Sequence, residues 1–93
     1  QIHGTVERSV LSPGVVVEAG AVVRDAIIMT DSTIGADAVV EHAIVDKLVH
    51  IGRGARVGGG TAASLALIGK GARVPDGVTV APKAVVQPGA TAA

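Results

Sequence analysis

The chain has 93 residues, no aromatic residue and no cysteine, and its eight basic and eight acidic side chains leave a formal net charge of +0. The sequence argues against nucleic-acid and membrane partners. It has no excess of basic residues, no aromatic residue that could stack on a base, and no apolar run of roughly 20 residues. The composition also excludes a disulfide framework and thiolate zinc sites, and since no signal-peptide pattern is present we expect a cytoplasmic protein.

The apolar residues make up 48% of the chain and are mainly Val, Ile, Leu and Ala. Because 13 glycines and four prolines interrupt these strand-forming and small residues, the composition predicts many short strands joined by tight turns. The chain begins at Gln1 instead of a methionine, so we expect it to be a piece of a longer protein.

Large aliphatic residues recur along the chain in steps of five, six and six residues. The first ten of these positions are Val6, Leu11, Val17, Val23, Ile28, Ile34, Val40, Val45, Ile51 and Val57. The next position falls on Ala62, and the series resumes at Ile68, Val74, Val80 and Val86. Steps of this length exclude an amphipathic helix, in which apolar residues lie three and four apart.

Three aliphatic positions in every seventeen residues predict a coil with three flat sides, built from short parallel strands stacked about 4.8 Å apart. On this period Ile34, Ile51 and Ile68 share one interior column, and Val57 lies beneath Val74. Small residues at Ala21, Ala38, Ala55 and Ala72 are expected where the walls converge. We expect an all-β coil of about five turns over residues 1–86, followed by a C-terminal tail over residues 87–93.

This pattern resembles the hexapeptide repeat, and the resemblance implies a left-handed parallel β-helix. The phrases RSVLSPGV, IIMTD and VDKLVHIG are similar to the C-terminal domain of bacterial ADP-glucose pyrophosphorylase, and the match runs from Gly4 to about Val80. It implies the regulatory and oligomerisation domain of a glucose-1-phosphate adenylyltransferase. That enzyme makes ADP-glucose and pyrophosphate from ATP and glucose 1-phosphate for glycogen biosynthesis.

The same resemblance implies that this chain has neither a catalytic residue nor a metal or cofactor of its own. The nucleotidyltransferase domain, with its Mg²⁺, would belong to a missing N-terminal part that acts as a partner of this one. A homo-oligomer, a tetramer in that family, and phosphorylated metabolite effectors are the other implied partners.

Five basic side chains are the candidates for binding such anionic effectors. Lys47 and Lys70 match the activator-binding lysines of the family. On a seventeen-residue turn Lys70 lies one turn from Arg53, and Arg73 lies one turn from Arg56. Like charges about 5 Å apart repel each other, so a phosphate between them would turn repulsion into charge-assisted hydrogen bonds. The alternative interpretation is that these are solvated charges that keep the coil soluble.

The remaining polar residues predict ordinary contacts between turns, with Arg24 on Glu41 and Asp25 on His42. The spacing of the three histidines does not fit a zinc site. The glycine-rich segment VGGGTAAS, residues 57–64, is interpreted as corner glycines and not as a phosphate-binding loop.

Three other functions stay open. One is the C-terminal domain of another sugar nucleotidyltransferase, such as a mannose-1-phosphate guanylyltransferase, and another is a purely structural assembly module. The third is a hexapeptide acyltransferase, in which a histidine acts as general base beside an acyl-CoA groove between subunits. This last function is disfavoured because the sequence shows neither the protruding loop nor the C-terminal helix that such enzymes usually carry.

Overall fold

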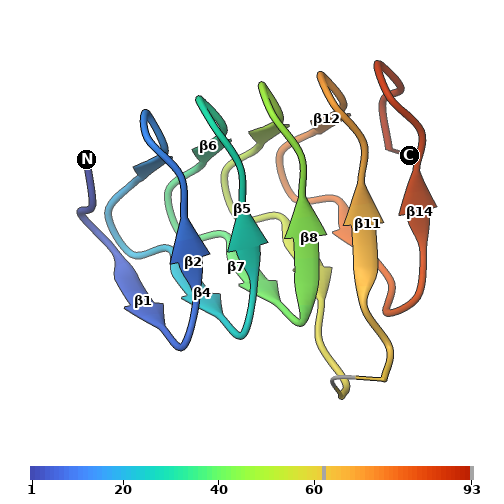
Figure 1. The fold of residues 1–93 in the computed structure, drawn as a ribbon, viewed down its shortest axis with the longest axis horizontal. Helices are drawn as coiled ribbons and strands as arrows, with labels where there is room; N and C mark the ends of the chain where they lie inside the picture. The colour runs from blue at the N-terminus through green and yellow to red at the C-terminus, as the bar shows by residue number, and fades with distance from the viewer. Residues whose placement is uncertain (62, 93) are drawn as a thin grey trace.

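The computed structural model describes residues 1–61 and 63–92, which form fourteen short strands and, over these residues, no helix. The chain winds as a coil in which each turn adds one strand to each of three parallel sheets (Figure 1). The predicted all-β coil with three sides is therefore confirmed. No helix that could cross a membrane is found in the described part of the chain.

The three sheets are the three sides of the coil, and every strand pair within them is parallel. The first sheet consists of β1 (Thr5–Glu7), β4 (Val22–Arg24), β7 (Val39–Glu41), β10 (Arg56–Gly58) and β13 (Thr79–Val80). The second consists of β2 (Val10–Leu11), β5 (Ile27–Ile28), β8 (Ala43–Val45), β11 (Ala66–Ile68) and β14 (Val85–Val86). The third consists of β3 (Val16–Val17), β6 (Thr33–Ile34), β9 (His50–Ile51) and β12 (Arg73–Val74).

The core is a stack of aliphatic side chains, because one residue of each strand points into the coil. In the third sheet Val17, Ile34, Ile51 and Val74 are all 0% exposed. Each such side chain stabilises the fold by roughly 1.5–3 kcal/mol relative to exposure in water. The predicted small residues, Ala21, Ala38, Ala55 and Ala72, are also fully buried.

The pairing of strands departs from the predicted period after Val57. Val23 pairs with Val40 and Val40 with Val57, which are steps of seventeen residues. Val57 then pairs with Val80, which is a step of 23 residues. The six additional residues lie between β10 and β11, where the chain leaves the coil in a loop that projects below the second sheet in Figure 1. We refer to residues 59–61 and 63–65 as the projecting loop.

The projecting loop moves every later residue by one side of the coil. Ile68 pairs with Val45 in the second sheet, whereas the neighbour of Ile51 in the third sheet is Val74. The prediction that Ile34, Ile51 and Ile68 form one column is therefore wrong, as is the stacking of Val74 on Val57. Ala62, which was expected to face inward, lies outside the described residues.

The end of the coil beyond β12 continues the same pattern. Thr91 forms a parallel bridge with Arg73, so residues 87–92 run along the third sheet. A hollow of about 350 Å³ opens at this end between Val80, Val86 and Ala90. The inner walls of the last turn are thus accessible from the end of the coil.

Ser32 is a fully buried polar side chain in an otherwise aliphatic core. Its hydroxyl donates to the Asp46 carbonyl oxygen at 2.6 Å and accepts from the Val49 amide at 3.1 Å. Ser32→Ala is expected to lower the free energy of unfolding by about 1–3 kcal/mol, because two buried backbone groups lose their partner. Urea denaturation followed by far-UV circular dichroism measures this.

Ser9 provides a matched control for that substitution. Its hydroxyl makes the same kind of contacts, donating to the Glu7 carbonyl oxygen at 2.8 Å and accepting from the Ala26 amide at 3.1 Å, but at a partly exposed site. Water can replace the hydroxyl there, so Ser9→Ala is expected to cost less than Ser32→Ala. Equal losses for the two variants would contradict the argument from burial.

Candidate functional site

The five predicted basic residues are not arranged as the sequence suggested. Gly71 donates its amide to the Lys47 carbonyl oxygen at 2.9 Å, so Lys70 lies one turn from Lys47 and not from Arg53. Arg73 pairs with His50 in the third sheet. The predicted stacking of Lys70 on Arg53 and of Arg73 on Arg56 is therefore wrong.

The neighbours of the two remaining arginines are not basic. The Arg53 amide donates to the Asp76 carboxylate at 2.8 Å, and Arg56 pairs with Val39 and Thr79 on its two sides. Lys47 and Lys70 are thus the only two of the five candidates that adjacent turns bring together among the described residues. Anion binding by these five side chains stays a prediction.

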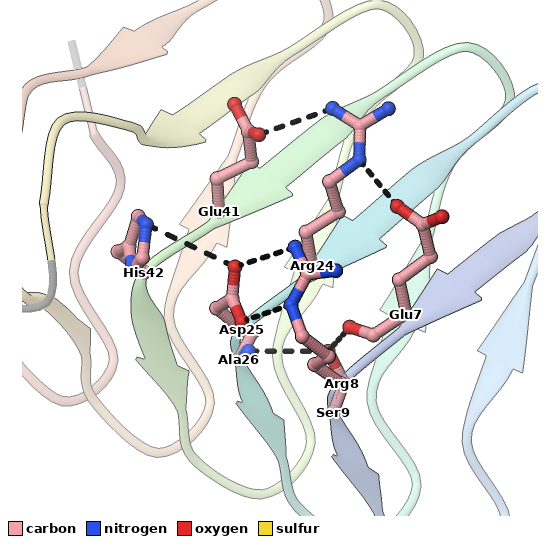
Figure 2. A network of polar contacts seen from close by, with 8 residues as sticks. All are labelled: Glu7, Arg8, Ser9, Arg24, Asp25, Ala26, Glu41 and His42. Carbon is pink, nitrogen blue, oxygen red and sulfur yellow. Dashed lines mark hydrogen bonds and ion pairs between the residues drawn. The ribbon is translucent and has the colours of Figure 1, made fainter.

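Two columns of polar side chains follow the corner between the first and second sheets, as Figure 2 shows. In one column Arg24 bridges two carboxylates, Glu7 Oε1 at 2.8 Å and Glu41 Oε2 at 3.2 Å. The predicted contact of Arg24 with Glu41 is confirmed. Because these groups are 33–46% exposed, water screens each pair and its contribution to stability is small.

The second column consists of Arg8, Asp25 and His42, one residue from each of three successive turns (Figure 2). Arg8 donates two hydrogen bonds to the Asp25 carboxylate, from Nε at 2.8 Å and from Nη2 at 3.1 Å. His42 Nε2 lies 3.9 Å from Asp25 Oδ2, which confirms the predicted contact. All three residues have φ between 46° and 49°, so positive φ is a requirement of this corner and not a peculiarity of the histidine.

His42 occupies the last turn of this column, and the projecting loop begins in the next turn of the coil, at the same corner. Gly59, at the start of the loop, donates its amide to the Glu41 carbonyl oxygen at 2.8 Å. Ala66, just after the loop, donates to the carbonyl oxygen of His42 itself at 3.1 Å. Both ends of the loop are therefore hydrogen-bonded to the backbone at Glu41 and His42, so the loop begins and ends at the corner that His42 occupies.

The histidine at this corner differs from the other two in its surroundings. Its side chain is 22% exposed, whereas His3 and His50 are exposed residues. His50 lies on the third sheet beside a shallow hollow that Arg53 and Asp76 also line. Within the described residues no group of three or more His, Asp or Glu side chains is placed to hold a metal ion. His42 is thus the histidine best placed for chemistry.

The charge on Asp25 supports that role. The hydrogen bonds from Arg8 lower the pKa of the Asp25 carboxyl below its ordinary value, so the group is ionised at neutral pH. At 3.9 Å the contact with His42 is too long for a hydrogen bond, and it is an ion pair only when the imidazole is protonated. A carboxylate at that place favours the imidazole tautomer with its N–H toward Asp25, which leaves the other ring nitrogen free to accept a proton.

The lowered pKa of Asp25 also makes stability depend on pH. Because the folded-state pKa lies below that of the unfolded chain, the contribution of Asp25 is present above the unfolded pKa and is lost as the pH falls through the folded pKa. Asp25→Asn is therefore expected to be less stable than the wild type at neutral pH and to lose less stability between about pH 5 and about pH 2. Urea denaturation of both proteins across this range measures the difference, and parallel curves would contradict it.

The coil of three parallel sheets, with a six-residue insertion beside one histidine, defines a β-helix of the hexapeptide-repeat class. Residues 2–80 match the family described as GlmU-like, C-terminal hexapeptide, and the chain belongs to that family. The repeat and the left-handed β-helix expected from the sequence are therefore confirmed at this level. No curated protein sequence matches the chain.

Solved structures give a more specific comparison. The acetyltransferase domain of PglB from Neisseria gonorrhoeae is 29% identical, with a TM-score of 0.61, over 99% of this chain and 48% of that one. A mutant GDP-perosamine N-acetyltransferase from Caulobacter crescentus, solved with CoA and GDP-perosamine, is 28% identical over 96% of this chain and 49% of that one, with a TM-score of 0.47. The chain therefore spans about half the length of these structures.

These findings correct the predicted function. The similarity is to an acetyltransferase domain, so the assignment to a regulatory domain of glucose-1-phosphate adenylyltransferase, with a nucleotidyltransferase as the parent enzyme, is wrong. The phrases that suggested it belong to the repeat itself, in which aliphatic, glycine and alanine positions recur in any coil of this kind. A shared coil does not determine a shared reaction.

Proposed function

We propose that this chain is the β-helix part of an acetyltransferase and that His42 is its general base. The observation that carries the proposal is the position of His42: it is partly buried, it faces an ionised carboxylate, and it lies where the projecting loop leaves and rejoins the coil. The likeness to an acetyltransferase domain at a TM-score of 0.61 supports the same reaction class.

The proposed reaction moves an acetyl group from a thioester, with acetyl-CoA as the donor, to an amine or hydroxyl acceptor. The acceptor's lone pair forms a bond to the thioester carbonyl carbon as its proton passes to the free nitrogen of His42. The carbon–sulfur bond then breaks, and the proton on the imidazolium goes to the departing thiolate. The products are an acetylated acceptor, a free thiol and the neutral histidine.

Asp25 and Arg8 act on this reaction through His42, as positioning residues. The positive charge that His42 acquires is stabilised by the nearby Asp25 carboxylate, which the two hydrogen bonds from Arg8 hold in place. If the chain were a purely structural module, Arg8, Asp25 and His42 would contribute only weak ion pairs.

The test is an assay of acetyl transfer by the full-length protein that contains these residues. Acetyl-CoA is supplied with a panel of amine and hydroxyl acceptors that includes amino sugars and nucleotide-linked amino sugars. Release of CoA thiol is followed with a chromogenic thiol reagent, and the acetylated acceptor is identified by mass spectrometry. This chain has no cysteine, so its own residues add no background in the thiol assay.

The expected result is thiol release that depends on both the acceptor and the enzyme. A folded protein that transfers acetyl groups to no member of the panel, and does not bind acetyl-CoA in isothermal titration, would overturn the proposal. Binding of acetyl-CoA without turnover would support the donor site and direct the search to other acceptors.

A further inference from the structure

A second hollow lies at the corner between the third and first sheets, away from the corner that His42 occupies. Its volume is about 560 Å³. Its lining residues belong to four successive turns, those that contain β3, β6, β9 and β12 of the third sheet, whose side of the coil lies at the back in Figure 1. Since neighbouring strands are about 4.8 Å apart, the hollow is about 14 Å long. We call it the trough.

Small residues form the floor of the trough. Ala19 and Ala36 line it, and Gly35 lies beside them without a side chain. A Cβ atom on Gly35 would collide with the backbone of Gly52 and Arg53 in the next turn, so glycine is required there. The close packing of the turns thus keeps this part of the trough free of side chains.

Charged side chains stand at both ends of the trough and between them. Glu18 lies at the end toward the N-terminus and Asp76 at the end toward the C-terminus. Arg53 lies one turn before Asp76, because the Gly77 amide donates to the Arg53 carbonyl oxygen at 2.9 Å. No acidic residue other than Asp76 follows Asp46 in the sequence, so the C-terminal half of the chain places its one carboxylate side chain here.

These charges do not neutralise one another. Where arginine and a carboxylate meet across adjacent turns elsewhere, they form a salt bridge, as Arg8 and Asp25 do at 2.8 Å. The Asp76 carboxylate instead accepts a hydrogen bond from the backbone amide of Arg53, through Oδ1 at 2.8 Å. Among the ion pairs of the described residues, none involves the Arg53 guanidinium or the Glu18 carboxylate. Both groups are therefore available to a ligand.

The arrangement of these charges restricts the class of ligand. A ligand with one sign of charge would leave either Arg53 or the two carboxylates without a partner, whereas a dipolar ligand matches all three. Nucleobases are disfavoured because the chain has no aromatic side chain on which they could stack. Within the described residues no group of three or more His, Asp or Glu side chains could hold a metal ion. The trough therefore suits a small zwitterion.

We propose that the trough binds a free diamino acid of the lysine type. The α-carboxylate accepts hydrogen bonds from the Arg53 guanidinium, and the α-ammonium group donates to Asp76 in the next turn. The aliphatic part of the ligand lies over Ala36 and Ala19. Its distal ammonium group pairs with Glu18, two turns or about 10 Å from Arg53. Because the trough is open to water and the ligand is small, the expected Kd is on the order of 1 mM.

Saturation-transfer difference NMR with the full-length protein tests the proposal, because the method detects weak ligands. The probes are L-lysine, norleucine and 1,5-diaminopentane. Norleucine lacks the distal ammonium group, and 1,5-diaminopentane lacks the carboxylate. Each is expected to bind about fivefold more weakly than lysine, since each loses one partly hydrated ion pair.

Two variants assign these losses to residues. Glu18→Gln is expected to weaken lysine about fivefold and to leave norleucine unchanged, whereas Arg53→Gln should weaken lysine about fivefold and leave 1,5-diaminopentane unchanged. The matched controls remove the same charges elsewhere. Asp31→Asn acts at a corner where φ is 60°, which asparagine tolerates, and Arg56→Gln acts on an exposed residue of the first sheet. Both controls should bind lysine as the wild type does.

Three results would overturn the proposal. One is the absence of saturation transfer from about 10 mM lysine, roughly ten times the expected Kd. Another is equal binding of the three probes, or equal behaviour of each variant and its control. The third is loss of lysine binding in His42→Asn, which would place the ligand at the other corner. The proposal does not rest on the proposed function, and no acetyl-CoA is present in these measurements, so the two can fail independently.

Discussion

Replacing His42 with asparagine is expected to lower kcat for acetyl transfer by about 10²–10⁴-fold, which is the usual contribution of a general base. Asparagine removes the basic nitrogen but suits the corner, where His42 has a φ of 47° and where asparagine is among the residues that tolerate positive φ. The fold and the binding of acetyl-CoA should therefore persist. Initial rates of thiol release, together with isothermal titration of acetyl-CoA, separate the loss of turnover from a loss of binding.

His50→Asn is the control for that experiment. This histidine is exposed on the third sheet, where it pairs with Thr33 and Arg73 and not with a carboxylate. Its replacement should change kcat by less than about threefold, as expected of a solvated side chain outside the site. A larger loss for His50→Asn than for His42→Asn would move the general base to the other side of the coil and contradict the assignment.

Gly58→Ala is expected to lower the free energy of unfolding by about 3 kcal/mol or more, the largest stability loss predicted here. Gly58 has a φ of +77°, and a Cβ atom on it would collide with the carbonyl oxygen of Glu41 in the neighbouring turn. Because that oxygen accepts the hydrogen bond from Gly59 that fixes the start of the projecting loop, the collision should also disturb the corner around His42. Thermal and urea unfolding by circular dichroism measure the effect, since the chain has no tryptophan or tyrosine for fluorescence.

Gly54→Ala separates backbone strain from collision. Gly54 has a similar φ of +68°, but a Cβ atom there would meet no described atom within 4 Å. Only the strain of positive φ remains, which costs about 1–2 kcal/mol for a residue with a side chain. Equal losses for Gly54→Ala and Gly58→Ala would show that contact with Glu41 does not constrain the corner.

The architecture was predictable because its period is written in the spacing of aliphatic residues. Val23, Val40 and Val57 lie seventeen residues apart and do stack in the first sheet. Alanine at the corners was equally predictable, since the converging walls leave Ala38 and Ala55 with no exposed surface. These features depend on local spacing and side-chain volume, both of which the sequence states directly.

The change of pairing after Val57 could not be predicted from that spacing. The projecting loop adds six residues, which is also the length of one side of the coil. The aliphatic rhythm therefore continues through it unbroken, while Ile68 moves from the third sheet to the second. Only the run of three glycines at residues 58–60 signals the loop, and the same run is equally typical of a tight corner.

The candidate site was missed for the same reason. The contact between Asp25 and His42 was predicted, but without the loop it was one polar pair among several on the surface. The basic residues were predicted as the site instead, because a constant period places Lys70 one turn from Arg53. In the structure Lys70 lies one turn from Lys47. What distinguishes His42 from the other histidines is its position beside the loop. That position follows from strand pairing, which an insertion as long as one side of the coil changes without changing the aliphatic spacing.

The way the projecting loop joins the coil has a consequence for how such proteins diversify. It departs and returns through hydrogen bonds to Glu41 and His42, in the same turn, so the turns on either side keep their pairing. A segment attached in this manner can be lengthened, shortened or exchanged without rebuilding the scaffold. Under the proposed function, acceptor preference can then evolve in this one short stretch while His42 and the residues that support it stay unchanged.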